Sequence, residues 1–115
     1  MNKINEFYNM IGGNYLEVKE RMQNDEMIKY FILKFKEDKN YSLLGKAIAN
    51  SDANDAFRYA HTLKGVCLNL SFTNLYKVVF EITEKLRKGD LDNINFYYEK
   101  VMNEYEKINK AVSLL

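Results

Sequence analysis

Hydrophobic side chains recur every three or four residues along most of this chain, which is the spacing of one face of an α-helix. The clearest case is residues 53–71, where the apolar positions form one continuous row: Ala56, Ala60, Leu63, Cys67 and Leu70. Such a row places all its members on one side of a helix. The pattern therefore predicts a long helix with one buried face, beginning after the capping pair Ser51-Asp52.

Four further segments show the same periodicity. Residues 25–38 open with the start signal Asn24-Asp25, residues 41–50 resume the pattern after a polar break, and residues 74–88 follow Thr73 as N-cap and end at Gly89. The last helix is predicted to begin at Leu91 or Asp92. The side chains predicted to face inward from the first and last of these helices are Met27, Ile28, Phe31, Ile32 and Phe35, and Ile94, Tyr97, Tyr98, Val101, Met102, Tyr105 and Ile108.

The first 23 residues are predicted to form short helices. An amphipathic opening is separated by Gly12-Gly13 from residues 14–23, which read as a helix capped by Asn14. Helices joined by short connections pack antiparallel to their neighbours. The prediction is an all-α fold in a single domain over residues 1–115: an antiparallel four-helix bundle with an additional short N-terminal helix or helices.

Composition narrows the classes of function. Lys+Arg 17 against Asp+Glu 16 gives a net charge of +1, so we expect neither nucleic acid nor a membrane surface as partner. No segment has the ~18 apolar residues of a membrane span, and the opening MNKINEFYNM lacks a signal-peptide core, so we expect a cytoplasmic protein. One cysteine, Cys67, excludes an internal disulfide and cysteine-rich zinc sites. Met1 and a helix running to Leu115 favour a free-standing protein, although a domain cut from a hybrid kinase would look the same.

The single histidine, His61, stands beside the apolar row of the long helix and faces outward. Lys64 and Gly65 follow it at i+3 and i+4 and therefore lie next to it. Phe57 and Leu68 continue the same outer strip. A glycine inside a helix costs about 1 kcal/mol relative to alanine, so Gly65 requires a reason: clearance for a second protein, or close packing of two helices.

This grouping suits phosphoryl transfer. A neutral imidazole is a competent nucleophile toward a phosphoryl group, and a lysine ammonium offsets the charge of the product. No glycine-rich phosphate loop occurs in the sequence, so the phosphoryl group has to come from a partner. A metal or cofactor site in a bundle needs several histidines or Glu-x-x-His pairs, and hydrolytic catalysis needs a nucleophile at a suitable spacing; one histidine supports neither.

The stretch AHTLKG, residues 60–65, resembles the signature of histidine-containing phosphotransfer (Hpt) domains of bacterial and eukaryotic phosphorelays. The similarity continues in NSDANDAFRYAHTLKG, in LNLSFTNLYKVVFEITEKLRKGD and in YLEVKERMQNDEMIKYFILKF. Roughly residues 14–90 follow the family pattern, and a final helix comes where the family has one.

The resemblance implies that the chain carries phosphoryl groups without an ATP site of its own and is not an enzyme. His61 would be the phosphoryl acceptor, Lys64 the stabilising cation, and Gly65, Phe57 and Leu68 the clearance and docking residues. The implied partners are response-regulator receiver domains and a sensor or hybrid histidine kinase. No metal or cofactor is expected on this chain, because Mg²⁺ would belong to the receiver domain; we also expect a monomer.

Two positions depart from the family pattern. Ser71 stands where the family commonly has glycine, at the turn that closes the histidine helix. Thr83 stands where the family usually offers Gln or Glu to the imidazole, which makes Thr83 a candidate imidazole-orienting residue with a shorter reach. This second departure leaves an alternative function open: a transfer-inactive helical protein-interaction module with the same fold.

Overall fold

Seven helices follow one another along residues 2–115 of the computed structural model, the part of the chain that is described, and no strand occurs in it. Met1, on which the expectation of a free-standing protein partly rests, lies outside the described residues. The helices are α1 (Lys3–Ile11), α2 (Tyr15–Met22), α3 (Asp25–Lys36), α4 (Asn40–Ala49), α5 (Ala53–Leu70), α6 (Thr73–Arg87) and α7 (Ile94–Val112).

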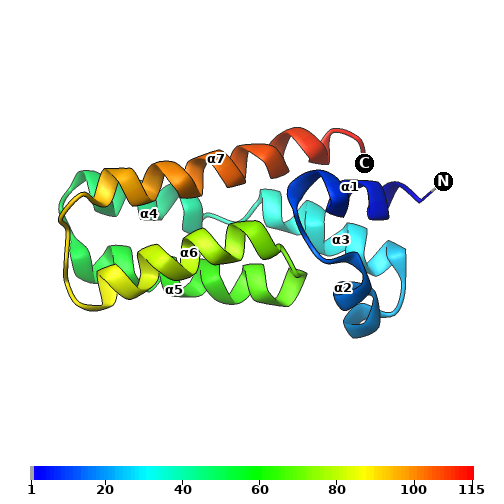
Figure 1. Cartoon of the computed structure of the whole chain (residues 1–115), viewed down its shortest axis with the longest axis horizontal. Helices are drawn as coiled ribbons and strands as arrows, with labels where there is room; N and C mark the ends of the chain where they lie inside the picture. The colour runs from blue at the N-terminus through cyan, green and yellow to red at the C-terminus, as the bar shows by residue number, and fades with distance from the viewer. Residues whose placement is uncertain (1) are drawn as a thin grey trace.

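The last four helices form an antiparallel bundle. Helix α5 packs against α4 and α6, α6 packs against α7, and α7 returns to contact α4, so the four helices close a ring (Figure 1). The molecule is 45 Å long and about half as wide, and α1, α2 and α3 gather at the end where α5 passes into α6 (Figure 1). The predicted four-helix bundle with short additional N-terminal helices is confirmed.

Most predicted helix starts are confirmed by their capping hydrogen bonds. The side chains of Asn14, Asn24 and Asp52 each accept a hydrogen bond from the backbone N–H three residues later, which satisfies a donor that the first helical turn leaves free. The prediction for Thr73 as N-cap is wrong: Thr73 is the first helical residue, and Phe72 precedes it without a capping side chain.

Helix α6 ends near Gly89 as predicted, whereas helix α7 begins later than predicted. Gly89 has a φ of +70°, the left-handed conformation that glycine adopts without strain. Helix α7 begins only at Ile94, because the backbone N–H of Asp92 donates to the Asp90 carboxylate and Asn93 is itself left-handed, with a φ of 54°.

The core lies along the predicted row of α5. Ala56, Ala60, Leu63, Cys67 and Leu70 are all buried. Three predicted inward positions are wrong, because Met27, Phe31 and Met102 are 45%, 37% and 40% exposed. A helix at the edge of a bundle buries a narrow row of side chains, so positions one step away from that row remain at its margin.

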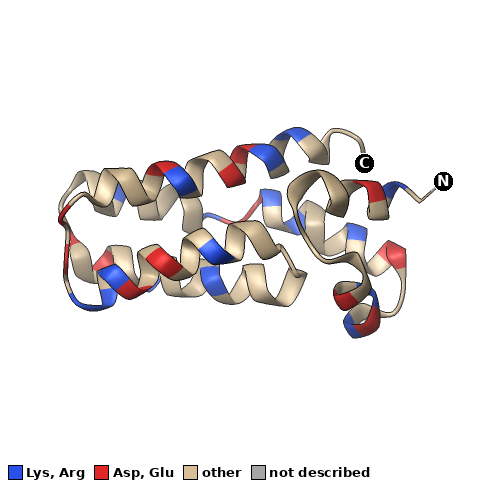
Figure 2. Cartoon of the chain, viewed as in Figure 1, with Lys and Arg blue, Asp and Glu red and all other residues tan. Residues whose placement is uncertain are grey.

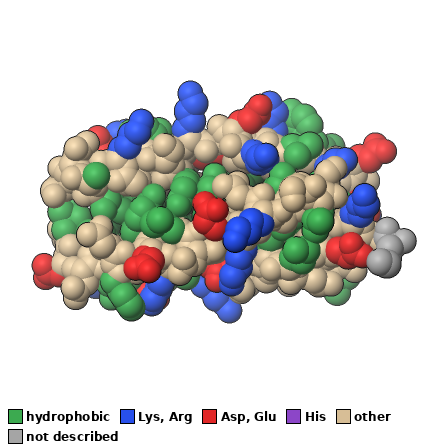
Figure 3. All heavy atoms as spheres, turned by 90° about the horizontal axis from the view of Figure 1, so that it is seen from above, with side chains coloured by type: hydrophobic (Ala, Val, Ile, Leu, Met, Phe, Trp, Pro, Cys, Tyr) green, Lys and Arg blue, Asp and Glu red, His purple; other side chains and the backbone are tan. Residues whose placement is uncertain are grey.

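Three tyrosines join α4 to α7. Tyr41 stacks on Tyr105 with ring centroids 3.7 Å apart and on Tyr98 at 5.9 Å. From the side on which α7 and α4 lie, hydrophobic side chains form a band in one half of the molecule and no histidine is visible (Figure 3).

The end of α5 is fixed to α2 through Ser71, which is buried and has a φ of +56°. Its hydroxyl donates to the Glu17 carboxylate at 2.6 Å and accepts a hydrogen bond from Arg21 at 3.0 Å. Its carbonyl accepts from the backbone N–H of Asn14 at 2.9 Å. A left-handed backbone favours glycine, and the side-chain hydrogen bonds offset part of the strain of the serine that stands here.

Each of the seven helices described carries charged side chains, with both signs interspersed in all but α4, whose one charged residue is Lys46 (Figure 2). No helix within residues 2–115 combines the length and the apolar character that crossing a membrane requires.

Candidate functional site

His61 lies in the middle of α5 with its side chain exposed. The buried row on the opposite side of the helix fixes this orientation, because turning His61 inward would expose Leu63 and Cys67 and lose the stabilisation of their burial. Burial also raises the pKa of the Cys67 thiol, which marks Cys67 as a core residue and no rival nucleophile.

The imidazole stacks on the ring of Phe57, one helical turn earlier. The ring centroids are 5.7 Å apart and the planes are inclined by 28°. Phe57 is half-buried, and the guanidinium carbon of Arg87 on α6 lies 4.9 Å from the centre of its ring. Arg87 is in turn paired with the Glu84 carboxylate at 3.1 Å. Contacts therefore run from α6 through Phe57 to the imidazole.

Lys64 extends toward α6. Its ammonium lies 5.4 Å from the centre of the Phe80 ring, and no carboxylate among the described residues is within ion-pair distance of it. A cation over an aromatic face gains about 0.5–1 kcal/mol at an exposed site. That contact is weak enough for the ammonium to leave when a stronger anionic partner arrives.

Gly65 faces open space. Apart from its chain neighbours and the nearby backbone of α5, a Cβ atom built there would meet no atom of the described chain within 4 Å, which excludes the packing explanation for this glycine. Leu68 continues the strip with 54% of its surface exposed. Beside it, a depression of about 150 Å³ is lined by Glu17, Cys67, Leu68, Ser71, Thr73 and Tyr76.

Thr83 does not make the contact that the sequence suggested. Its side chain is fully buried, and its hydroxyl donates to the carbonyl of Val79 in its own helix at 2.6 Å. This local bond uses the one proton that the hydroxyl could offer an imidazole. Within residues 2–115, the imidazole of His61 has no hydrogen-bond partner, so the expectation that Thr83 orients it by donating a hydrogen bond is corrected.

Phe80 and Arg87 are not among the site residues predicted from the sequence, yet α6 places them beside Lys64 and Phe57. Their partners follow from the antiparallel register: Lys64 and Phe80, like Phe57 and Arg87, are equally far from Phe72 at the turn. Helix α6 begins almost immediately after α5 ends. Counting equal numbers of residues backward and forward from Phe72 in the sequence therefore predicts both contacts.

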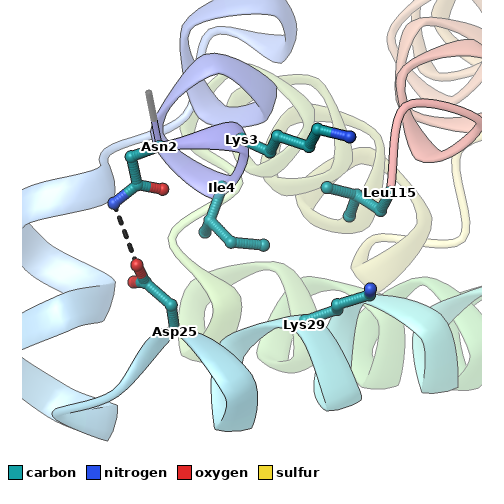
Figure 4. A pocket seen from close by; sticks show the side chains of 6 residues that line it. All are labelled: Asn2, Lys3, Ile4, Asp25, Lys29 and Leu115. Carbon is teal, nitrogen blue, oxygen red and sulfur yellow. Dashed lines mark hydrogen bonds between the residues drawn. The ribbon is translucent and has the colours of Figure 1, made fainter.

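A separate pocket of about 540 Å³ lies where α1, α3 and the end of the chain meet (Figure 4), and none of its lining residues belongs to α5 or α6; they are Asn2, Lys3, Ile4, Asp25, Lys29 and Leu115. Asp25 accepts hydrogen bonds from Asn2 at 2.9 Å, Tyr15 at 2.7 Å and Lys19 at 3.1 Å. Burial raises the pKa of Asp25, but these hydrogen bonds outweigh it and hold the pKa below its ordinary value. This junction binds the N-terminal helices together and brings no reactive group to His61.

The part of the chain that the structure describes contains no cluster of three or more His, Cys, Asp or Glu side chains able to hold a metal ion. The cofactor expectation, with Mg²⁺ on the partner, stays a prediction.

A comparison with known protein families matches the greater part of the chain. The model of the Hpt domain matches residues 32–109, a span that begins inside α3 and includes α4, α5, α6 and most of α7. The matched span thus contains His61, the residues beside it on the outer side of α5, and their neighbours on α6. A search of curated proteins and a search of solved structures found no match to the chain.

Proposed function

The chain belongs to the Hpt domain family, and from that premise we propose that it is a histidine phosphotransfer protein of a two-component phosphorelay. His61 accepts a phosphoryl group and passes it to, or takes it from, the aspartate of a response-regulator receiver domain. The observation that carries the proposal is the open space at Gly65, next to an exposed imidazole in a matching helix. A helix that keeps a costly glycine where no described part of its own chain needs the room leaves that room for a partner.

The chemistry asks little of this chain. An imidazole nitrogen of His61 attacks the phosphorus of an aspartyl phosphate, a nitrogen–phosphorus bond forms, and the oxygen–phosphorus bond breaks with its electron pair returning to the aspartate. The reverse sequence unloads the histidine. Positioning and charge neutralisation supply most of the catalysis of such transfers, and Mg²⁺ bound in the receiver's acidic pocket would contribute charge neutralisation from the partner's side.

Lys64 supplies charge from the acceptor side. Its ammonium rests on Phe80 and forms no ion pair within the described chain, so no carboxylate has to be given up when it turns to the phosphoryl oxygens. Docking is mainly apolar, through the half-buried Phe57 and the exposed side chains of Leu68 and Phe80. A sensor or hybrid histidine kinase is the other source of the phosphoryl group.

The protein so described is a phosphoryl carrier without its own ATP site, and we propose that it acts in the cytoplasm as a monomer.

One observation favours a second function, that of a transfer-inactive interaction module. Thr83 is turned into the core, so the hydrogen bond that the family usually gives the imidazole from this position is missing.

One experiment separates these functions. The protein is incubated with Mg²⁺ and a panel of receiver domains carrying radiolabelled aspartyl phosphate, beside a His61→Gln variant. Acid-labile, base-stable label on the wild type alone is the expected result. No label from any receiver, with binding to a receiver retained, would overturn transfer and leave the interaction module.

A further inference from the structure

We propose that Phe57 is a positioning residue for the transfer reaction: its ring, braced by Arg87 and Glu84, sets the orientation of the His61 imidazole. This role rests on the proposed function and differs from the docking role expected for Phe57. It concerns a contact within the chain, made before any partner arrives.

The geometry limits the freedom of the imidazole. Phe57 and His61 are i, i+4 neighbours on α5, and their rings lie at 5.7 Å with an inclination of only 28°, the offset arrangement in which aromatic rings attract each other. Within residues 2–115 no hydrogen bond holds the imidazole. An exposed histidine without such a bond would otherwise exchange between staggered χ1 rotamers.

Phe57 is itself held in place. One side of it packs against the bundle core, and the Arg87 guanidinium lies 4.9 Å from its ring centre, within cation–π distance. Glu84 fixes Arg87 through both its Nε and a terminal nitrogen, each at 3.1 Å from the same carboxylate oxygen. The ring therefore offers the imidazole a surface that is anchored on two helices.

Orientation affects the rate because transfer requires the attacking nitrogen close to and in line with the phosphorus–oxygen bond that breaks. A residue that holds the imidazole in one rotamer removes conformations that cannot react. The stack thus replaces, by contact from the same helix, the orienting hydrogen bond that Thr83 does not supply.

The test uses the full chain and phosphoramidate, a small donor that needs no docking surface, with phosphohistidine followed by ³¹P NMR. We expect Phe57→Leu to lower the phosphorylation rate constant about five-fold, as the loss of one ordered side-chain rotor implies. Phe57→Tyr keeps the ring and should stay within two-fold of the wild type, by the same reasoning. Phe96→Leu, which removes a ring of 58% exposure from α7, is the matched control and should behave as wild type.

A second readout is independent of activity. In the wild type, three-bond couplings should show one χ1 rotamer for His61, and its ring protons should be shifted by the Phe57 ring current; in Phe57→Leu the couplings should average. Averaged couplings in the wild type, or an unchanged rate in Phe57→Leu, would overturn the positioning role. Failure of the wild type to accept phosphate from phosphoramidate and from every receiver would overturn the proposed function, while the couplings would still decide whether Phe57 orients His61.

Discussion

The ammonium of Lys64 lies 5.4 Å from the centre of the Phe80 ring, so this lysine, three residues after His61 on α5, rests on the neighbouring helix α6. No hydrogen bond joins Lys64 to His61 in the described chain. Under the proposed function, the ammonium leaves this ring for the oxygens of a phosphoryl group on the imidazole. This relationship gives the first prediction.

Lys64→Gln should shift the transfer equilibrium away from the phosphorylated histidine about tenfold, because a charge-assisted hydrogen bond contributes about 1.5–3 kcal/mol and solvent exposure reduces it. The equilibrium is measured by mixing labelled receiver with each variant. Lys77→Gln, an exposed lysine on α6, is the matched control. Equal positions of equilibrium for wild type and Lys64→Gln would show that the ammonium does not stabilise the product.

Gly65 should separate stability from transfer. Gly65→Ala should raise the free energy of unfolding by about 1 kcal/mol, because the added methyl group meets no described atom within 4 Å beyond its chain neighbours and the nearby backbone of α5. Gly65→Gln should fold normally yet slow transfer from a receiver at least about tenfold, since a clash of its side chain with the partner costs more than 1.4 kcal/mol.

Chemical denaturation and transfer from a labelled receiver measure the two effects. Ser42→Gln places the same side chain at an exposed position on α4 and should leave transfer unchanged. Normal transfer by Gly65→Gln would remove the clearance role.

Thr83→Val should leave transfer within about two-fold of wild type, which corresponds to less than 0.5 kcal/mol of barrier, because the hydroxyl contacts Val79 and not the imidazole. Unfolding stability should change by no more than about 1 kcal/mol, as only one local hydrogen bond is lost. A ten-fold slower transfer at unchanged stability would return Thr83 to an orienting role.

Ser71→Ala should lower the free energy of unfolding by about 1–2 kcal/mol, because it removes the hydrogen bonds to Glu17 and Arg21 while keeping the left-handed backbone. Ser51→Ala is a matched control: Ser51 has a φ of 53° and an exposed side chain. Urea titration should show a lower free energy of unfolding for Ser71→Ala and an unchanged one for Ser51→Ala. Equal losses would assign the effect to the backbone conformation.

Asp25 should make stability depend on pH. Its folded pKa lies below the ordinary value, so its stabilising contribution is complete above the unfolded pKa of about 3.9 and is lost as the pH falls through the folded pKa. At pH 7, Asp25→Asn should lower the free energy of unfolding by about 1 kcal/mol. The effect is modest because the Asp25 side chain is 34% exposed.

The difference between wild type and Asp25→Asn should shrink as the pH is lowered below about 4. Thermal unfolding at pH 7 and pH 3 measures it, with Glu106→Gln on α7 as an exposed control. A difference that stays constant over this range would mean that the Asp25 charge contributes nothing.

Helix identity and much of the capping could be read from the sequence because both are local properties. The buried row of α5 repeats at helical spacing, and the side chains of Asn14, Asn24 and Asp52 cap the turns directly after them. Thr73 failed as a cap because helix α6 starts one residue earlier than that role requires. A boundary shift of this size depends on how the tight turn after α5 closes.

The spacing of apolar residues did not predict which side chains at the edge of a helix's buried face are themselves buried. Met27, Phe31 and Met102 have the spacing of core residues, yet each is more than a third exposed. Spacing states which side of a helix is apolar, and only the neighbouring helices determine how wide a strip they cover.

By itself, the sequence determined that this chain is an α-helical protein with its one histidine on the outer side of the long helix, because periodicity and capping act within a few residues. Only the tertiary structure decided that Gly65 faces open space, that Thr83 turns into the core, and that Arg87 braces the ring beside the histidine. Those three facts depend on the register between α5 and α6, which is set by the packing of side chains distant in sequence.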